Sequence, residues 1–198
     1  MKNQKEKIST IRTYVLLRKA LYELLTEKPF EKISLTDICT RSMVPRSTFY
    51  RYFEDKYDLL HYNLVLFFAD ARLTPDVIIS TDIASLKRFL SILFAHFEKH
   101  RADYVKIYQL NRQGVLIETM REFLIRIFTE KLTEARKDGA KLKIPEEIFT
   151  YLLAEFYVSA AKCYLEAETP YGAKEFVDGV TGFANKDFFE QSPLTGNP

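Results

Sequence analysis

Hydrogen-bond donors are concentrated in one short stretch of the chain, residues 46–52, which reads RSTFYRY. Two arginines supply guanidinium groups, and a serine, a threonine and two tyrosines supply hydroxyls. All of these groups donate hydrogen bonds, and arginine also carries a fixed positive charge. A helix that only packed against its neighbours would not need so many donors. The composition of the stretch therefore indicates a surface that binds an anionic partner.

Other patterns that could support chemistry are weak. His96 and His100 have the spacing of two metal ligands on one helical face, but a third ligand is not evident. We find no Ser-His-Asp grouping, glycine-rich phosphate loop or carboxylate pair with a supporting motif. We therefore expect no enzymatic activity, no cofactor and no metal site.

The composition is that of an ordinary folded protein and favours helices. The chain has 198 residues, of which 47% are hydrophobic and 28% charged, with 6 glycines and 7 prolines. Long segments with apolar residues at helical spacing dominate, so we expect an all-α fold. The net charge is only +2, but the first 60 residues hold 12 lysines and arginines against 8 aspartates and glutamates. The excess of positive charge therefore lies at the amino-terminal end.

Two further features bear on where the protein works. The sequence has no run of about 18 apolar residues, and its start, MKNQKEKIST, lacks the apolar core of a signal peptide. Cys39 and Cys163 lie among apolar neighbours in predicted helices, and we expect both to be buried free thiols in a reducing compartment. We therefore expect a cytoplasmic protein that does not bind membranes.

The donor-rich stretch is predicted to lie in the third of four amino-terminal helices. The first helix covers about 11–27. A second, short helix begins after Ser34, whose hydroxyl can cap the helix while the carboxylate of Asp37 bonds back to it, as in a capping box. Pro45 is expected to start the third helix, and the fourth runs over about 55–72.

The third helix is predicted to have one apolar and one polar side. Phe49 and Phe53 are four residues apart and point inward together with Val44. The polar side carries Arg46, Ser47, Tyr50 and Arg51, with Thr48 and Tyr52 at its edges. Two short helices joined by a tight turn, the second rich in donors, are the arrangement that places a helix in the major groove of DNA. The alternative is a basic amphipathic helix that simply faces solvent.

The same residues resemble the tetracycline-repressor (TetR) family of bacterial transcriptional regulators. The resemblance extends from about Arg12 to Leu60 and rests above all on residues 47–53, STFYRYF, which are followed by EDK. It implies an all-α homodimer in which residues 1–58 form a three-helix helix-turn-helix DNA-binding domain. Residues 59–198 would form the larger helical domain that dimerises and binds an effector.

Carried over position by position, the resemblance implies a set of DNA contacts. The candidate base readers are Arg46, Ser47, Thr48 and Arg51. The candidate phosphate contacts are Tyr50, Tyr52, Lys56 and, at the start of the preceding helix, Ser34 or Thr36. The partner would be double-stranded DNA with a palindromic operator, because the two reading helices of a symmetric dimer lie about 34–36 Å apart, one turn of DNA.

The turn between the second and third helices departs from the family pattern. Met43 stands where the family commonly has glycine, and Ser42 stands where alanine is frequent. A residue other than glycine held at a positive φ costs about 1–2 kcal/mol. We therefore expect either a strained Met43 or a slightly different turn.

After a domain boundary in residues 73–82, the sequence predicts helices over about 82–100, 102–110, 114–138, 145–168 and 171–190. Their many aromatic residues could line an effector cavity or form an ordinary core. Because the family tends to place its effector there, the candidate ligand-binding residues are Tyr104, Tyr108, Asn111 and Arg112. The last two helices are the candidate dimer interface.

The leading hypothesis is a ligand-responsive DNA-binding regulator, most often a repressor in this family. A small-molecule effector would change the separation of the two reading helices and so weaken operator binding. The alternative is a co-regulator that keeps the fold, binds other proteins and no longer binds DNA. The low net charge and Met43 are compatible with this alternative.

Overall fold

The structure of the protein is a computed structural model that describes residues 2–70, 83–137, 143–167 and 172–184. Within these ranges the chain forms nine α-helices, one 3₁₀-helix and no strand, so the predicted all-α fold is confirmed. No helix in these ranges is both long and apolar enough to span a lipid bilayer.

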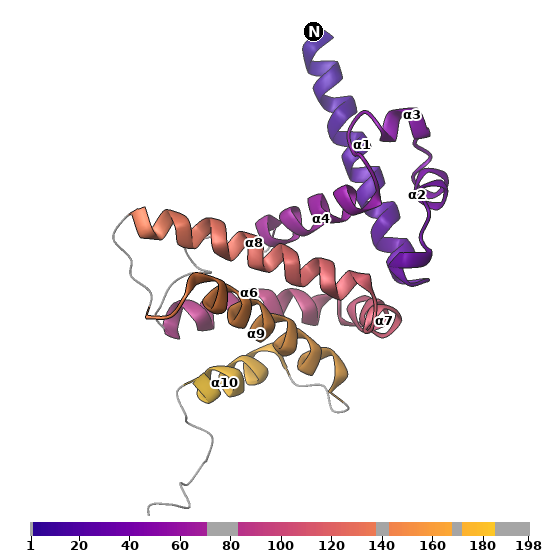
Figure 1. Ribbon diagram of the computed structural model, residues 1–198. Coiled ribbons are helices and arrows are strands. Elements are labelled where there is room, and N and C mark those ends of the chain that lie inside the picture. Colours follow the sequence, from indigo (N-terminus) through magenta and orange to yellow (C-terminus); the bar gives the residue numbers. More distant parts are fainter. Residues whose placement is uncertain (1, 71–82, 138–142, 168–171, 185–198) are drawn as a thin grey trace, which may run out of the picture.

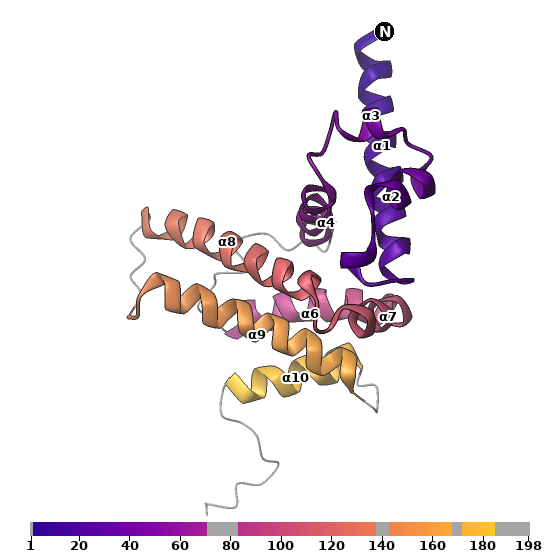
Figure 2. The ribbon, with the colours of Figure 1, turned by 45° about the vertical axis from the view of Figure 1, so that its right-hand side comes forward.

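The helices form two groups that α4 connects. The first group is α1 (Lys2–Leu25), η1 (Phe30–Lys32), α2 (Leu35–Ser42), α3 (Arg46–Phe49) and α4 (Lys56–Asp70). The second is α6 (Ile83–Lys99), α7 (Arg101–Asn111), α8 (Val115–Lys137), α9 (Glu146–Glu166) and α10 (Ala173–Ala184). Figure 1 shows α1, α2 and α3 at one end of the molecule, and Figure 2 shows the first turns of α1 projecting beyond the other helices. Because α4 contacts both α1 and α8, it joins the two groups.

Helix α1 begins well before the predicted helix. It starts at Lys2, whereas the apolar pattern in the sequence starts near Ile11. Residues 2–10 lack that pattern, but they contain neither glycine nor proline, so nothing in them breaks a helix. The predicted core face of α1 is confirmed, because Leu17 and Leu21 are fully buried.

The predicted capping box at the start of α2 is confirmed. The backbone N–H of Asp37 donates to the Ser34 hydroxyl at 3.1 Å, and the Asp37 carboxylate accepts from the backbone N–H of Ser34 at 2.8 Å. These bonds satisfy amides that the first turn of a helix leaves without partners. They fix where α2 begins, and therefore the position of the turn that follows it.

Met43 is strained in the turn between α2 and α3. Its φ of 53° and ψ of 29° lie in the left-handed region. Among the described residues other than glycine, only Met43 has a positive φ. Its backbone N–H donates to the carbonyls of Cys39 and Thr40, and its side chain is 88% exposed. The turn thus keeps the conformation for which glycine is preferred, and the first of the two alternatives is confirmed.

The second group of helices is built from two packed pairs. Helix α8 packs along α9, and α10 packs along α6 (Figure 1). Phe89, Phe94, Phe128 and Tyr164 are almost completely buried in this core. In this second group, the predicted helix ends agree with the observed ones to within about two residues wherever the structure describes them. The predicted domain boundary at residues 73–82 lies outside the described residues.

The prediction for the two cysteines is half correct. Cys39 is buried in α2 as expected, but Cys163 is exposed. It lies on the same exposed side of α9 as Ser159 and Lys162, although its sequence neighbours are apolar.

We expect Met43→Gly to stabilise the protein by about 0.5–1 kcal/mol, because glycine adopts a positive φ without the clash of a Cβ but loses more chain entropy on folding. Urea denaturation at equilibrium measures the change. Met43→Ala is the matched control, since it removes the exposed side chain but keeps the Cβ, and it should give little or no gain. A lower midpoint for Met43→Gly than for the original protein would contradict this explanation of the turn.

Candidate functional site

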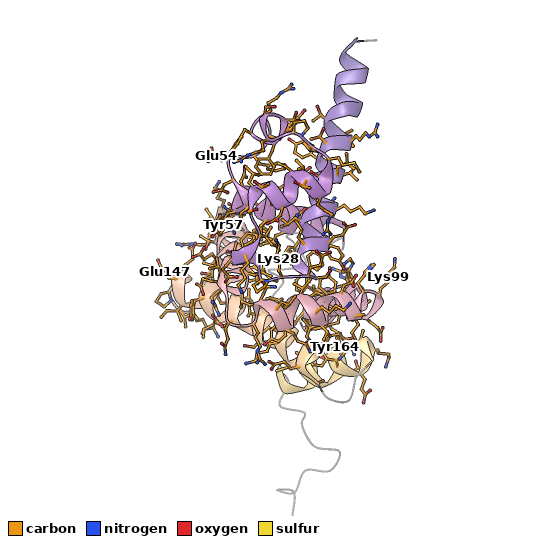
Figure 3. The ribbon with its side chains drawn as sticks, turned by 90° about the vertical axis from the view of Figure 1, so that its right-hand side faces the viewer. Lys28, Glu54, Tyr57, Lys99, Glu147 and Tyr164 are labelled. Carbon is orange, nitrogen blue, oxygen red and sulfur yellow. The ribbon has the colours of Figure 1, made fainter. Side chains whose placement is uncertain are left out.

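The predicted two-sided character of α3 and the turn after it is observed. Phe49 is completely buried and Phe53 is 4% exposed, and their ring centroids lie 5.6 Å apart. Arg46, Ser47 and Arg51 are exposed, and Tyr50 is 56% exposed. The two phenyl rings therefore anchor the helix from behind and leave its donors facing outward. Figure 3 shows Glu54, three residues after Arg51, at the end of the molecule remote from Tyr164 and the carboxy-terminal helices.

Thr48 and Tyr52, at the edges of this face, are less exposed to solvent than the central donors. Thr48 is half-buried. Tyr52 is half-buried as well, and its hydroxyl lies 3.3 Å from that of Thr10 in α1 while its ring lies 5.1 Å from that of Tyr14. The central donors are thus better placed than these two to meet a large partner.

At the start of α2, the two candidate hydroxyls differ. The Ser34 hydroxyl donates to the Asp37 carboxylate at 2.7 Å, besides accepting from the Asp37 amide, so the capping box uses it. The Lys28 ammonium, 2.8 Å away, and the bonds from Ser34 hold the pKa of Asp37 far below its usual range. Thr36 is exposed. Thr36 is therefore the better candidate for a phosphate contact.

The ammonium of Lys56 is bound to backbone carbonyls of the protein, so it is not available to contact a phosphate. Its ammonium donates to the carbonyls of Phe30, Glu31 and Ile33 at 2.9, 3.2 and 2.9 Å, and lies 4.6 Å from the centre of the Phe30 ring. An ammonium has three N–H donors, so these carbonyls use all of them. Burial lowers the pKa of Lys56. Our expectation that Lys56 contacts a phosphate is therefore corrected. Lys56 instead holds residues 30–33, which lie between α1 and α2 and which we call the junction segment.

The junction segment is also held from the carboxy-terminal helices. The Phe30 amide donates to the side-chain carbonyl of Asn111 at 2.7 Å, and the Asn111 side-chain amide donates to the carbonyl of Ile107 at 2.7 Å. The Glu31 carboxylate accepts from the backbone N–H of Val115 at the start of α8, which lowers the pKa of Glu31. Figure 3 shows Lys28 and Tyr57, which flank this region, midway along the molecule. The junction segment thus ties α4, α7 and α8 together.

Three residues at this junction were misread or not identified from the sequence. Asn111 is 1% exposed and does not line the cavity described below, so its expected role in ligand binding is corrected to that of a link between the helix groups. A Cβ on Gly114 would collide with the Glu31 carboxylate, so a larger residue there would push this carboxylate away from the Val115 amide. Glu31 is 84 residues from the amide that it caps, and no local pattern indicates such a distant pairing.

A cavity of about 760 Å³ lies between α1, α4 and the carboxy-terminal helices. Its walls are mostly apolar, including Phe67, Phe68, Leu93 and Leu124. Three of the four predicted ligand-binding residues line it, namely Tyr104, Tyr108 and Arg112. The size and the apolar walls are typical of a small-molecule site.

The polar side chains inside the cavity are mostly paired with one another. The Tyr104 hydroxyl lies 3.0 Å from Nε2 of His96, and burial raises the pKa of Tyr104, so its phenol stays neutral. The Tyr22 hydroxyl donates to Asp103 at 3.0 Å. The rings of His96 and His100 lie 5.1 Å apart, but no group of three or more potential metal ligands is placed to hold an ion in the described ranges.

Residues 17–62 match the profile of the family described as bacterial regulatory proteins, tetR family. Residues 17–62 are a tetR-family domain. The matched segment includes α2, α3, Met43 and the junction segment, which are the features described above. No curated protein sequence matches the chain.

Solved structures of transcriptional regulators, two of them described as TetR regulators, have the same fold over nearly the whole chain. A TetR transcriptional regulator from Streptococcus agalactiae is 19% identical, with a TM-score of 0.60 over 91% of this chain and 98% of that one. A putative TetR-family regulator from Syntrophomonas wolfei is 16% identical, with a TM-score of 0.60 over 93% and 99%. The regulator FadR from Bacillus subtilis, solved in complex with stearoyl-CoA, is 16% identical, with a TM-score of 0.58 over 89% and 100%. The chain therefore has the TetR-family regulator fold.

We expect Lys56→Ala to lower the free energy of unfolding by about 1–3 kcal/mol, because carbonyls of the junction segment lose their donor. Lys32→Ala is the matched control, since Lys32 is exposed in the same segment, and it should change stability by less than about 0.5 kcal/mol. Equilibrium urea denaturation of both variants gives the comparison. Equal stability of the two variants would restore Lys56 as a candidate phosphate contact.

Proposed function

We propose that the protein is a dimeric, sequence-specific DNA-binding transcriptional regulator of the cytoplasm, and that a small-molecule ligand controls it. The observation that carries the proposal is the exposed row of Arg46, Ser47, Tyr50 and Arg51, which Phe49 and Phe53 anchor from behind. This row lies within a tetR-family domain. Such a helix fits the major groove, and its side chains are those that contact bases and phosphates. The proposal includes no catalytic step.

Within this proposal the donors divide into two kinds. Arg46 is at the first position of α3, and a guanidinium there can donate two bonds to one guanine. Ser47 and Arg51 are the further base readers. Tyr50 and Thr36 contact phosphates, because both are exposed and can reach the backbone of the duplex beside the groove.

A second copy of the chain supplies the second reading helix. The outer face of α9 exposes Ile148, Tyr151 and Leu152 at 50%, 51% and 57%. In α10, by contrast, Ala173 and Val177 are buried within the chain, where α10 packs on α6. An exposed apolar stripe favours a partner, and a self-complementary stripe gives a two-fold dimer. We therefore narrow the predicted interface to α9, and the operator is palindromic.

Ligand control follows from the position of the cavity. Its walls come from α1 and α4 as well as from α6 to α9, so a ligand touches both groups of helices. The junction segment links α7 and α8 to the residues immediately before α2. A ligand that favours one arrangement of these helices would change the separation of the two reading helices and release the operator. The FadR neighbour, whose structure contains stearoyl-CoA, supports a ligand-binding role for this fold. The protein would then act as a repressor.

We expect Arg46→Ala to relax the preference for one operator base and to weaken operator binding by about 1–3 kcal/mol. Selection of bound sequences from random duplexes gives the operator, and titration of single-base variants gives the preference. Arg88→Ala, which removes an exposed arginine from α6, is the matched control. It should change neither the base preference nor the affinity for the operator. Affinity should also fall steeply with salt, because phosphate contacts release counterions.

The same experiment separates the two functions that the sequence leaves open. If no duplex is selected and binding to genomic fragments does not depend on salt, the protein does not act through DNA. The co-regulator alternative would then be preferred.

We expect Leu152→Glu to weaken dimerisation at least 100-fold, because it places a charge in the centre of an apolar interface. Leu110→Glu is the control, since Leu110 is an exposed leucine of α7. Sedimentation velocity across a concentration series measures both. If Leu152→Glu dimerises like the control, the interface lies elsewhere.

A further inference from the structure

A second hollow adjoins the apolar cavity. It has a volume of about 630 Å³ and lies between α7 and the end of α9, with Arg101, Gln109 and Glu166 among its walls. Tyr108, Arg112 and Leu165 line both hollows. We call the larger hollow the chamber and the smaller one the vestibule. The shared residues place the two hollows side by side, the chamber with mostly apolar walls and the vestibule with Arg101, Arg112 and Glu166 among its walls.

The vestibule contains positive charge that the protein itself does not neutralise. The guanidinium of Arg101 lies 4.6 Å from the centre of the Tyr164 ring and donates through Nη2 to the Tyr164 carbonyl at 3.0 Å. Its Nη1 is buried and has no hydrogen-bond partner within the described part of the chain. Arg112 is exposed and forms no ion pair there. Because Nη1 is closed to solvent, Arg101 acts on a ligand in the vestibule through its positive charge, and the exposed Arg112 supplies the accessible donors.

The carboxylates of the two hollows all accept hydrogen bonds from side chains of the protein. In the vestibule, Glu166 accepts from the Tyr108 hydroxyl at 2.8 Å. Burial, followed by this hydrogen bond, raises the pKa of Tyr108 to about 12, so the phenol remains a neutral donor. In the chamber, Asp103 accepts from Tyr22, and Glu155 is paired with Arg121. Glu166 keeps its negative charge, because a neutral phenol does not cancel it, but Arg101 and Arg112 outnumber it, so the net charge of the vestibule walls is positive.

We propose that the effector is an amphipathic anion, with an alkyl or acyl chain in the chamber and a carboxylate or phosphate head group in the vestibule. Apolar walls select the chain by burying it, and guanidinium groups bind carboxylates and phosphates through paired hydrogen bonds. Arg112 lines both hollows, so a head group in the vestibule lies beside it while the chain lies in the chamber. The proposal rests on the regulatory function above for the consequence of binding, but not for binding itself.

A series of ligands with one chain and four head groups tests the charge requirement. Calorimetric titration of the full chain, without DNA, compares dodecanoate, dodecyl phosphate, dodecanol and dodecylamine below their micelle concentrations. We expect the carboxylate or the phosphate to bind at least ten-fold more tightly than dodecanol, and dodecylamine to bind most weakly. Whichever anion binds better identifies the head group. Octanoate should bind about 100-fold more weakly than dodecanoate, because four methylene groups are missing.

Arg112→Ala tests the place of the head group. This substitution should weaken the binding of the anions about ten-fold and leave the binding of dodecanol unchanged. Lys106→Ala removes an exposed cation from the same helix outside both hollows, and it should have no effect. Arg112 is chosen because Arg101 also supports the ring of Tyr164, so a change there could disturb folding.

Three results would overturn the proposal: equal binding of dodecanol and the anions, tighter binding of the amine, or no binding of any member of the series. Loss of anion binding in Lys106→Ala as large as in Arg112→Ala would overturn the assignment of the vestibule. These titrations are done without DNA, so none of their results depends on whether the protein selects an operator. A wrong ligand class can therefore be distinguished from a wrong regulatory function. If the anions bind but no duplex is selected, the ligand class stands and the regulatory function fails.

Discussion

The arrangement of the two groups of helices depends on how the junction segment, residues 30–33, is held from both sides. On one side the ammonium of Lys56 donates to three of its carbonyls. On the other side the carboxamide of Asn111 accepts from the Phe30 amide, and the Glu31 carboxylate caps α8. The Phe30 ring fills the space between them and is completely buried. A segment of four residues is thereby fixed to the start of α4 and to both helices of the α7–α8 corner.

This constraint matters because Ser34 comes next in the chain. Ser34 caps α2, α2 ends in the strained turn at Met43, and the turn sets the direction of α3. A shift of the junction segment would therefore move the start of α2 and, through it, the donors of α3. The walls of the cavity include residues of α1 and of α4 and α7, the two helices whose side chains hold the junction segment. The route from ligand to reading helix in our proposal is thus short and passes through named hydrogen bonds.

The parts of this structure that could be predicted from the sequence are those set by neighbours within a few residues. The capping box at Ser34 and Asp37 and the buried pair Phe49 and Phe53 follow from local spacing. The positive φ at Met43 was one of two alternatives that the family's usual glycine suggested, because local sterics alone disfavour it for methionine. The contacts that could not be predicted join residues far apart in sequence. Lys56 has the composition of an anion site at a helix start, and only the fold shows that carbonyls 23 to 26 residues away occupy it.

Contacts between residues far apart in sequence also explain why the predictions for Asn111 and Cys163 were wrong. Asn111 lies in the region where a ligand was expected, but its side chain turns to an amide 81 residues earlier in the chain. The apolar neighbours of Cys163 do not reveal which side of α9 is covered by other helices. The exposed side of α3 and of the turn after it could be predicted because its donors lie within residues 46–51, and their contact with DNA stays a prediction. The chamber and the vestibule, by contrast, are lined by residues of six helices.

A double-mutant cycle in unfolding free energy between Lys56→Ala and Asn111→Ala tests most directly whether the junction segment is one unit held from both sides. The two side chains do not bond to each other, but each bonds to Phe30. If the segment is a single unit, releasing one side lowers the cost of releasing the other, and the two effects differ from additivity by about 0.5–3 kcal/mol. Additivity to within about 0.3–0.5 kcal/mol would show that the two sides act independently, which would contradict the account.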